Sequence, residues 1–168
     1  MPALYDVTIP AYIRGLKNLS AMLDKGKAFA SEQGLELSCL LDARLIDDMA
    51  PLTRQVQMVT DTAKFVAVRV GQMENEPWAD NETSYDDVQA RVAKAIAFLD
   101  KAAPEGFDGR EEAKVVLTTP SGDIPFTGST YVYGFAVPNF YFHLSMAYAL
   151  LRMKGVSVGK LDFLGSIR

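Results

Sequence analysis

The chain contains one histidine, His143, which is the first candidate for chemistry. It follows Asn139 by four residues, so on a helix the two side chains would share one face. An imidazole and an amide on one face, joined by a polar group from a facing helix, can bind a small polar ligand or a divalent metal ion. The sequence therefore predicts a polar pocket in the core of a helical bundle.

Gln57 and Asp61 are the partners expected for this pair on a facing helix. They too are four residues apart, and they stand beside an apolar stripe of helical spacing. We expect both side chains to face Asn139 and His143, with Gln55 as a neighbour.

Aromatic residues are concentrated around the histidine, and two interpretations of them stay open. They are suited to core and interface packing, or to forming the wall of a pocket for an apolar ligand. The residues are Tyr131, Tyr133, Phe135, Phe140, Tyr141, Phe142 and Tyr148. Of these, Tyr141 is included in the predicted ligand-binding set.

A tightly bound metal is not expected, because one His and one Cys cannot form a strong transition-metal site and amides are weak zinc ligands. If a divalent ion is held weakly, His143 and Asp61 would be its direct ligands, with Gln57 or Asn139 helping through water. No catalytic residue and no other cofactor is predicted.

A structural role is the alternative hypothesis. In it, His143 is a core residue that is hydrogen-bonded to Gln57, Asp61 or a tyrosine, and it fixes how two helices pack. The protein would then be a structural or interaction protein without catalytic activity.

Composition limits the classes of partner. The 168 residues are 49% hydrophobic and 23% charged, which is typical of one folded domain, here 1–168. The net charge of -4 without a basic cluster argues against nucleic acid, and we expect no membrane span and no signal segment. Cys39 is the one cysteine and is expected to be a small buried residue. Because a single cysteine forms no disulfide within the chain, the sequence fits a reducing compartment, and a cytoplasmic location is predicted.

Hydrophobic periodicity predicts an all-α fold, mainly a four-helix bundle. Period-two alternation around Pro120–Asp123 adds a short β-hairpin insert between the third and fourth helices. The expected segments are helices over 8–33, 49–73, 84–103 and 138–154, a connecting turn or short helix over 35–48, and a hairpin over about 114–128.

Several segments together resemble a known family. They are Leu41–Leu45, Gln55–Gln57, Asp61, Asn139–His143, Arg152, Gly155–Val156 and Leu161–Gly165. The chain resembles the DinB/YfiT-like metalloenzyme superfamily, and most closely a bacterial branch known only as a domain family of unknown function.

The resemblance implies a four-helix bundle that is often dimeric, so a homodimer is expected. Its members hold a metal with a His of the second helix and a His-x-x-x-His pair of the last helix. Here His143 matches the second His of the pair, Asn139 replaces the first, and the second helix has no His. The resemblance thus implies a degenerate metal site, and it puts in doubt the thiol-dependent transferase and isomerase chemistry of some relatives.

Overall fold

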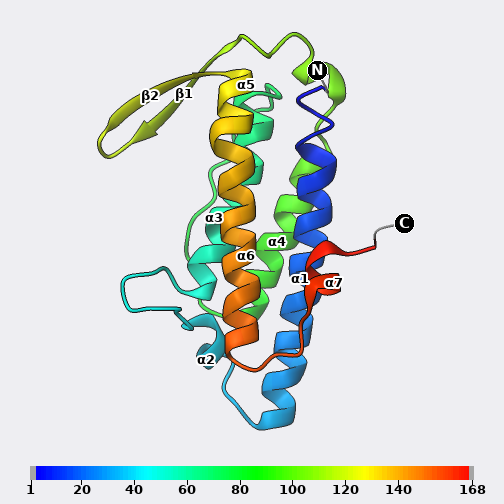
Figure 1. Ribbon diagram of the computed structural model, residues 1–168, viewed down its shortest axis with the longest axis vertical. Helices are drawn as coiled ribbons and strands as arrows, with labels where there is room; N and C mark the ends of the chain where they lie inside the picture. The colour runs from blue at the N-terminus through cyan, green and yellow to red at the C-terminus, as the bar shows by residue number, and fades with distance from the viewer. Residues whose placement is uncertain (1–2, 167–168) are drawn as a thin grey trace.

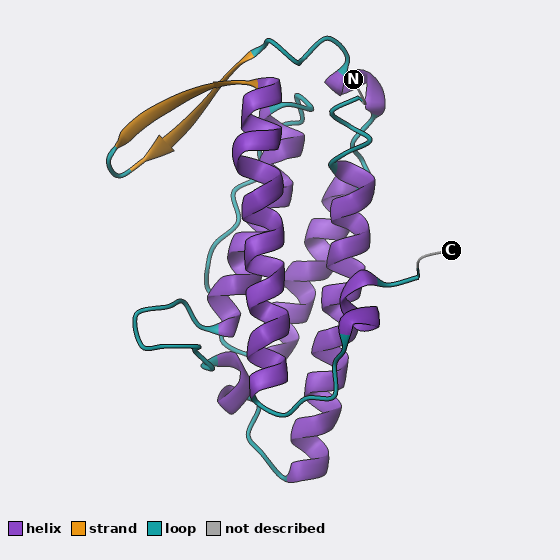
Figure 2. Cartoon of the chain, in the orientation of Figure 1, coloured by secondary structure: helices purple, strands orange, loops and turns teal. Residues whose placement is uncertain are grey.

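Four long helices form the body of the molecule in the computed structural model, which describes residues 3–166 (Figure 1). They are α1 (Ile9–Gln33), α3 (Leu52–Arg69), α4 (Tyr85–Leu99) and α6 (Val137–Met153). Each packs against two neighbours, in the order α1, α4, α3, α6 and back to α1. The predicted mainly α-helical bundle with one hairpin is confirmed (Figure 2).

α1 begins and ends where the sequence indicates. Pro10 lies in its first turn, where the missing N–H costs no hydrogen bond, and Gly34 follows it with a left-handed φ of 63°. α2 (Ser38–Leu41) is a single short turn in the connection to α3. Its Leu40 and Leu41 are buried, and they attach this connection to the core.

α3 and α4 run parallel, so a long crossover connects them. The segment 70–84 leaves the end of α3 and returns beside it, as two contacts show. Lys64 Nζ donates to the carbonyl of Glu76 at 3.0 Å, and Gln57 Nε2 donates to Glu82 Oε2 at 2.7 Å. The crossover therefore runs antiparallel to α3 and lies against it.

α4 begins with the predicted capping box. Ser84 Oγ accepts a hydrogen bond from the Asp87 N–H, and the Asp87 carboxylate accepts one from the Ser84 N–H at 2.8 Å. These reciprocal bonds satisfy two N–H groups that a helix start leaves free. Pro104 then opens a 3₁₀ turn, η1 (Pro104–Phe107), after the helix has ended.

The hairpin consists of β1 (Lys114–Thr119) and β2 (Gly122–Thr127) and projects from one end of the bundle (Figure 1). Val115 is buried opposite Phe126 at its base, whereas Val116 and Ile124 are exposed. An isolated two-stranded hairpin is marginally stable in water, so packing on another element is expected. In the described chain both strands of the hairpin contact α5 (Gly128–Tyr131), the short helix that follows.

The last long helix starts about ten residues earlier than predicted. α5 (Gly128–Tyr131) is capped by Thr127 and continues through a π-helical turn, η2 (Val132–Ala136), directly into α6. Pro138 sits in the first turn of α6, and this turn can form without the proline N–H. The sequence places the helix start at Pro138 because proline is common in the first turn of a helix, and it assigns no helix to the apolar residues Val132 and Ala136 before it, which are buried.

The C-terminal segment is docked on α1. Val156 and Val158 are buried, and α7 (Lys160–Leu164) lies against α1, where Asn18 Nδ2 donates to the Phe163 carbonyl at 2.9 Å. No described helix has the length and apolar character needed to cross a bilayer. Residues 1, 2, 167 and 168, which the predicted domain 1–168 includes, lie outside the described residues.

Candidate functional site

Polar contacts at seven-residue intervals join α3 to the helix that carries His143. Seven residues are two helical turns, so these α3 side chains share one face. The pairs are Gln55 with His143, Thr62 with Asn139, and Arg69 with Tyr131. Each donor–acceptor distance is 2.8 Å. This polar seam runs beside the apolar stripe that packs into the core.

His143 is the buried end of the seam. Its Nδ1 lies 2.8 Å from Gln55 Oε1, while Gln55 Nε2 donates to the Ala50 carbonyl at 3.1 Å. Because the amide oxygen can only accept, Nδ1 is the protonated nitrogen of the ring. Burial lowers the pKa of His143, and the charge of Arg54 lowers it further. The imidazole is therefore neutral at pH 7.

Nε2 of His143 is consequently an open acceptor. It makes no hydrogen bond within the described chain, and it is not among the described buried polar atoms that lack a partner. The Nε2 atom is therefore at least partly exposed to solvent. His143 is one of the residues that line a cavity beside the seam, so this acceptor is available to a ligand.

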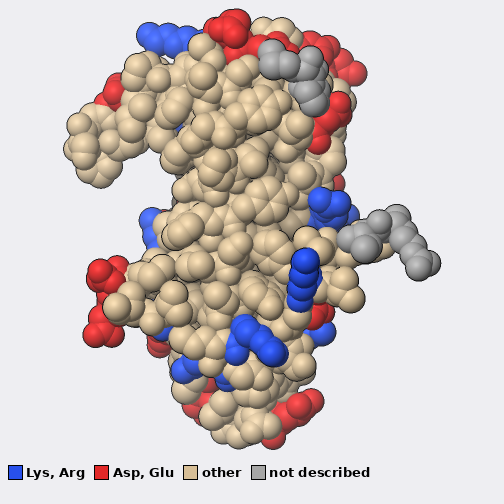
Figure 3. All heavy atoms as spheres, viewed as in Figure 1, with Lys and Arg blue, Asp and Glu red and all other residues tan. Residues whose placement is uncertain are grey.

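The cavity has a volume of about 360 Å³ and lies between α3, α6 and the hairpin. Its lining residues are Met58, Asp61, Thr62, Phe65, Arg69, Leu117, Thr118, Tyr131, Phe135, Asn139 and His143. Leu117 and Thr118 come from β1, so the hairpin supplies one wall and overhangs the hollow (Figure 3). The cavity thus lies on the flank of the bundle, whereas the sequence predicts a pocket in the bundle core, where the buried residues form a hydrophobic cluster.

Three of the five residues predicted for ligand binding line this cavity: Asn139, His143 and Asp61. Gln57 does not, because its side chain turns toward the crossover, where it bonds with Arg54 and Glu82. Gln57 and Gln55 are two residues apart, about 200° around a helix, so only one of them can face α6.

Tyr141 also lies outside the cavity lining. Its ring packs edge-on against Phe140 with centroids 5.2 Å apart. The aromatic residues divide in the same way: Tyr131 and Phe135 line the cavity, Phe140 is buried in the core, and Phe142 is exposed. The aromatic residues are therefore divided between the cavity lining, the core and the surface.

Asp61 lines the cavity and also belongs to a cluster of charged residues around Arg91. Its Oδ1 accepts a hydrogen bond from an Arg91 guanidinium N–H at 2.8 Å. Burial raises the pKa of Asp61, and the Arg91 charge opposes that rise. The carboxylate is accordingly paired with the Arg91 guanidinium.

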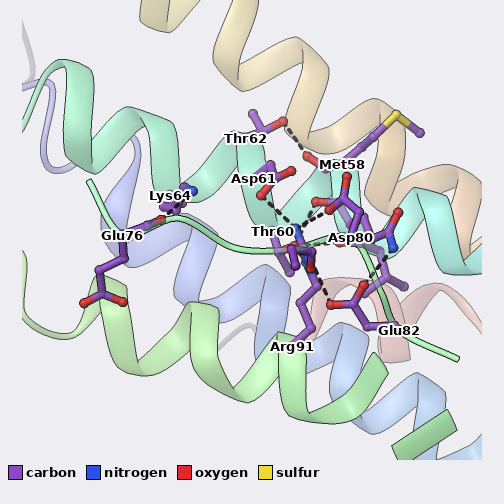
Figure 4. Close-up of polar contacts among 12 residues, drawn as sticks. Met58, Thr60, Asp61, Thr62, Lys64, Glu76, Asp80, Glu82 and Arg91 are labelled. Carbon is purple, nitrogen blue, oxygen red and sulfur yellow. Dashed lines mark hydrogen bonds and ion pairs between the residues drawn. The ribbon is translucent and has the colours of Figure 1, made fainter. Parts of the chain in front are cut away.

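Arg91 is the centre of this cluster and is 4% exposed (Figure 4). Besides Asp61, it bonds Thr60 Oγ1 at 2.9 Å, Glu82 Oε1 at 2.9 Å and Asp80 Oδ1 at 3.0 Å. Asp80 and Glu82 belong to the crossover, Asp61 and Thr60 to α3. Arg91 of α4 therefore fastens the crossover to two helices.

A second hollow, of about 570 Å³, lies between the crossover and α4. Arg91 and Glu82 line it, but they are bonded to each other at 2.9 Å. Trp78 also lines it and packs edge-on against Phe98, with centroids 5.6 Å apart. Arg91 and Glu82 thus serve the attachment of the crossover, and the seam cavity, which is lined by the one histidine, is the better candidate for ligand binding.

The residues of the cavity do not fit the metal that the superfamily implies. No group of three or more His, Cys, Asp or Glu residues that could hold a metal occurs within residues 3–166. Asn139 Nδ2 donates to Thr62, His143 Nδ1 is taken by Gln55, and the available carboxylate is paired with a guanidinium. An imidazole nitrogen remains as the one strong donor, which is too few for a structural or catalytic zinc site.

Sequence reasoning missed Thr62, Arg69 and the role of Gln55. The signal that would have found them is the seven-residue spacing of the polar residues at 55, 62 and 69, which places them on one face of α3. Cys39 was expected to be buried, but it is exposed, because Leu40 and Leu41 take the inward positions of α2.

Comparisons with known proteins agree with the helical-bundle fold. The chain is similar to a DinB family member protein from Shewanella denitrificans, whose crystal structure superposes with a TM-score of 0.90 at 35% sequence identity. The match covers 98% of this chain and 93% of that one. Among curated proteins, none matches.

The family model "Domain of unknown function (DUF1993)" matches residues 4–164. The chain therefore belongs to the DUF1993 family, and its likeness to a DinB-like bundle, expected from the sequence, is confirmed.

Proposed function

We propose that this protein binds a small organic molecule in the cavity between α3, α6 and the hairpin. One observation carries the proposal: Gln55 holds His143 at Nδ1, which leaves Nε2 as an unpaired acceptor at the cavity. A neutral imidazole placed in this way accepts a hydrogen bond from a hydroxyl, amino or amide group of a ligand.

The size and lining of the cavity support this function. Small-molecule sites usually enclose about 300–1,000 Å³ and combine apolar walls with a few placed polar groups. Here Phe65, Phe135 and Leu117 supply apolar wall, and His143 and Asn139 supply polar groups from adjacent turns of α6. The proposed activity is binding, because no nucleophile adjoins the imidazole in the described hydrogen bonds.

The single histidine allows a direct test by NMR. Its ring protons are assigned without ambiguity because the chain has no other His. Phenol, which has a donor, should shift the His143 ring signals, whereas anisole, which lacks one, should shift them less. The phenol response should survive in Tyr141→Phe, because Tyr141 lies outside the cavity. Ring signals that phenol leaves unchanged would contradict the proposal.

Replacing the histidine separates binding from the structural alternative. In His143→Leu, a melting temperature that holds or rises, together with loss of the phenol-induced thermal shift, supports a binding site. A large loss of stability, with no thermal shift in the wild type either, supports a core residue that only fixes helix packing.

The partner that we propose is a second copy of this chain, bound through the outer face of α6. No charged residue occurs from Val132 to Leu151, although Tyr133 and Phe142 are exposed. Figure 3 shows the corresponding face as a broad uncharged surface with the charged groups mostly at its edges. Interface cores are depleted in charge and enriched in Tyr, Phe and Met, which is the composition of this face.

Light scattering after size-exclusion chromatography tests the dimer. The wild type should have twice the chain mass, and Phe142→Arg should give the monomer because a buried unpaired charge would destabilise the interface. Leu161→Arg is the matched control, since Leu161 is 70% exposed on α7 and should leave the dimer intact. A wild type that is monomeric at all concentrations excludes this partner.

A further inference from the structure

Arg69 brings a positive charge to the end of the cavity opposite His143. It is the only Lys or Arg among the described residues that line the cavity. Its Nη1 donates to the Tyr131 hydroxyl at 2.8 Å, and its guanidinium lies 4.3 Å from the centroid of the Phe65 ring. Stacking and one hydrogen bond thus hold the guanidinium in place and leave most of its five N–H donors unused.

No carboxylate neutralises this charge. Within residues 3–166, none of the ion pairs involves Arg69. Asp61 is the one carboxylate that lines the cavity, and it already pairs with Arg91 at 2.8 Å. Asp61 is therefore engaged by another side chain, and Arg69 is left at the cavity as a guanidinium without an ionic partner in the described chain, which favours an anionic group of a ligand beside it.

The two polar ends are separated by an apolar wall. Arg69 and Gln55, which bonds His143, are fourteen positions apart on α3. Their backbones are therefore about 20 Å apart along the helix, and the side chains shorten the distance between the polar groups. Phe65 and Met58 lie between them on α3, and Phe135 and Leu117 face them from η2 and β1. A ligand that reaches both ends must have an elongated apolar body.

We infer that the ligand is an organic carboxylate with an aromatic or aliphatic body, whose carboxylate binds Arg69 and whose far end carries a hydrogen-bond donor for His143 Nε2. The inference rests on the function proposed above and adds the chemical class of the ligand. Arginine suits this role because its planar fork matches the two oxygens of a carboxylate.

The test compares two probes that differ only in charge. 4-(4-Hydroxyphenyl)butyrate has the carboxylate and the donor, and 4-(4-hydroxyphenyl)butanamide replaces the carboxylate by a neutral amide. Calorimetry should show the acid binding about tenfold more tightly than the amide, and the acid should shift the His143 ring signals. Arg69→Gln should remove this preference for the acid, whereas Arg69→Lys should retain part of it.

Arg14→Gln is the matched control, because Arg14 is exposed on α1 and lines none of this cavity. It makes the same change in net charge, so it should keep the full preference. If acid and amide bind equally while still shifting the His143 signals, the carboxylate inference is overturned and the binding function stands. If neither probe binds, both are overturned. A preference that Arg14→Gln reduces as much as Arg69→Gln reflects net charge alone and also overturns the inference.

Discussion

Gln55 Oε1 lies 2.8 Å from His143 Nδ1, and this contact decides which imidazole nitrogen carries the proton. The Gln55 amide is itself fixed, because its Nε2 donates to the Ala50 carbonyl. The segment just before α3, whose Ala50 carbonyl holds the Gln55 amide, thus determines which ring nitrogen of His143 on α6 carries the proton.

Gln55→Glu should raise the pKa of His143 above its ordinary value of about 6.5. A carboxylate next to Nδ1 favours the imidazolium, whereas burial now favours the neutral ring. An NMR titration of the single histidine measures the change. Gln57→Glu, the same substitution two residues away, should have little effect because Gln57 bonds Glu82 on the crossover side. Equal effects of the two substitutions would contradict the assignment of Gln55.

Stability should fall as the pH drops below about 6.5. Burial lowers the pKa of His143 in the folded state, so between that lowered value and 6.5 the unfolded chain binds more protons. This contribution is fully present above 6.5 and is lost as the pH falls through that window, with a slope of at most about 1.4 kcal/mol per pH unit. Urea unfolding at pH 7.5, 6.5 and 5.5 measures it.

The same series with His143→Gln is the control, because glutamine does not titrate. Its stability should change less over this range of pH. A wild type whose stability rises on acidification would mean that His143 is protonated in the fold.

Arg91→Met should destabilise the protein by about 2–4 kcal/mol. Its loss leaves Asp61 and Glu82 without their ion-pair partner and Asp80 with Arg54 alone, although the partial exposure of the two aspartates moderates the cost. Denaturant unfolding measures the change. Lys27→Met removes an exposed ion pair with Asp86 and should cost less than about 1 kcal/mol. Similar losses in both variants would show that Arg91 does not fasten the crossover.

Gly106→Ala should destabilise by about 1–3 kcal/mol, because an added Cβ would lie 2.5 Å from the Gly71 carbonyl oxygen. That close approach joins η1 to the end of α3. Gly134→Ala is the control, since nothing lies within 4 Å of a Cβ at that position. Thermal unfolding compares the two, and a neutral Gly106→Ala would show that the two backbones separate easily.

The sequence by itself determined the helices and their order along the chain. Helical spacing of apolar residues located α1, α3 and α4, and the capping pair Ser84 and Asp87 marked the start of α4 correctly. Period-two alternation gave the hairpin with its turn at Pro120. These signals are local, because each depends on residues within a few turns of one another.

Only the tertiary structure decided which polar residue meets which. Gln55, Gln57 and Asp61 all flank the apolar stripe of α3, and the stripe does not say which flank faces α6 and which faces the crossover. That choice depends on the order of helices around the bundle, hence on the path of the 70–84 crossover and on the buried Arg91 that holds it. Packing of segments that are distant along the chain placed Gln55 on His143 and Arg69 in the cavity, and no local pattern contains that information.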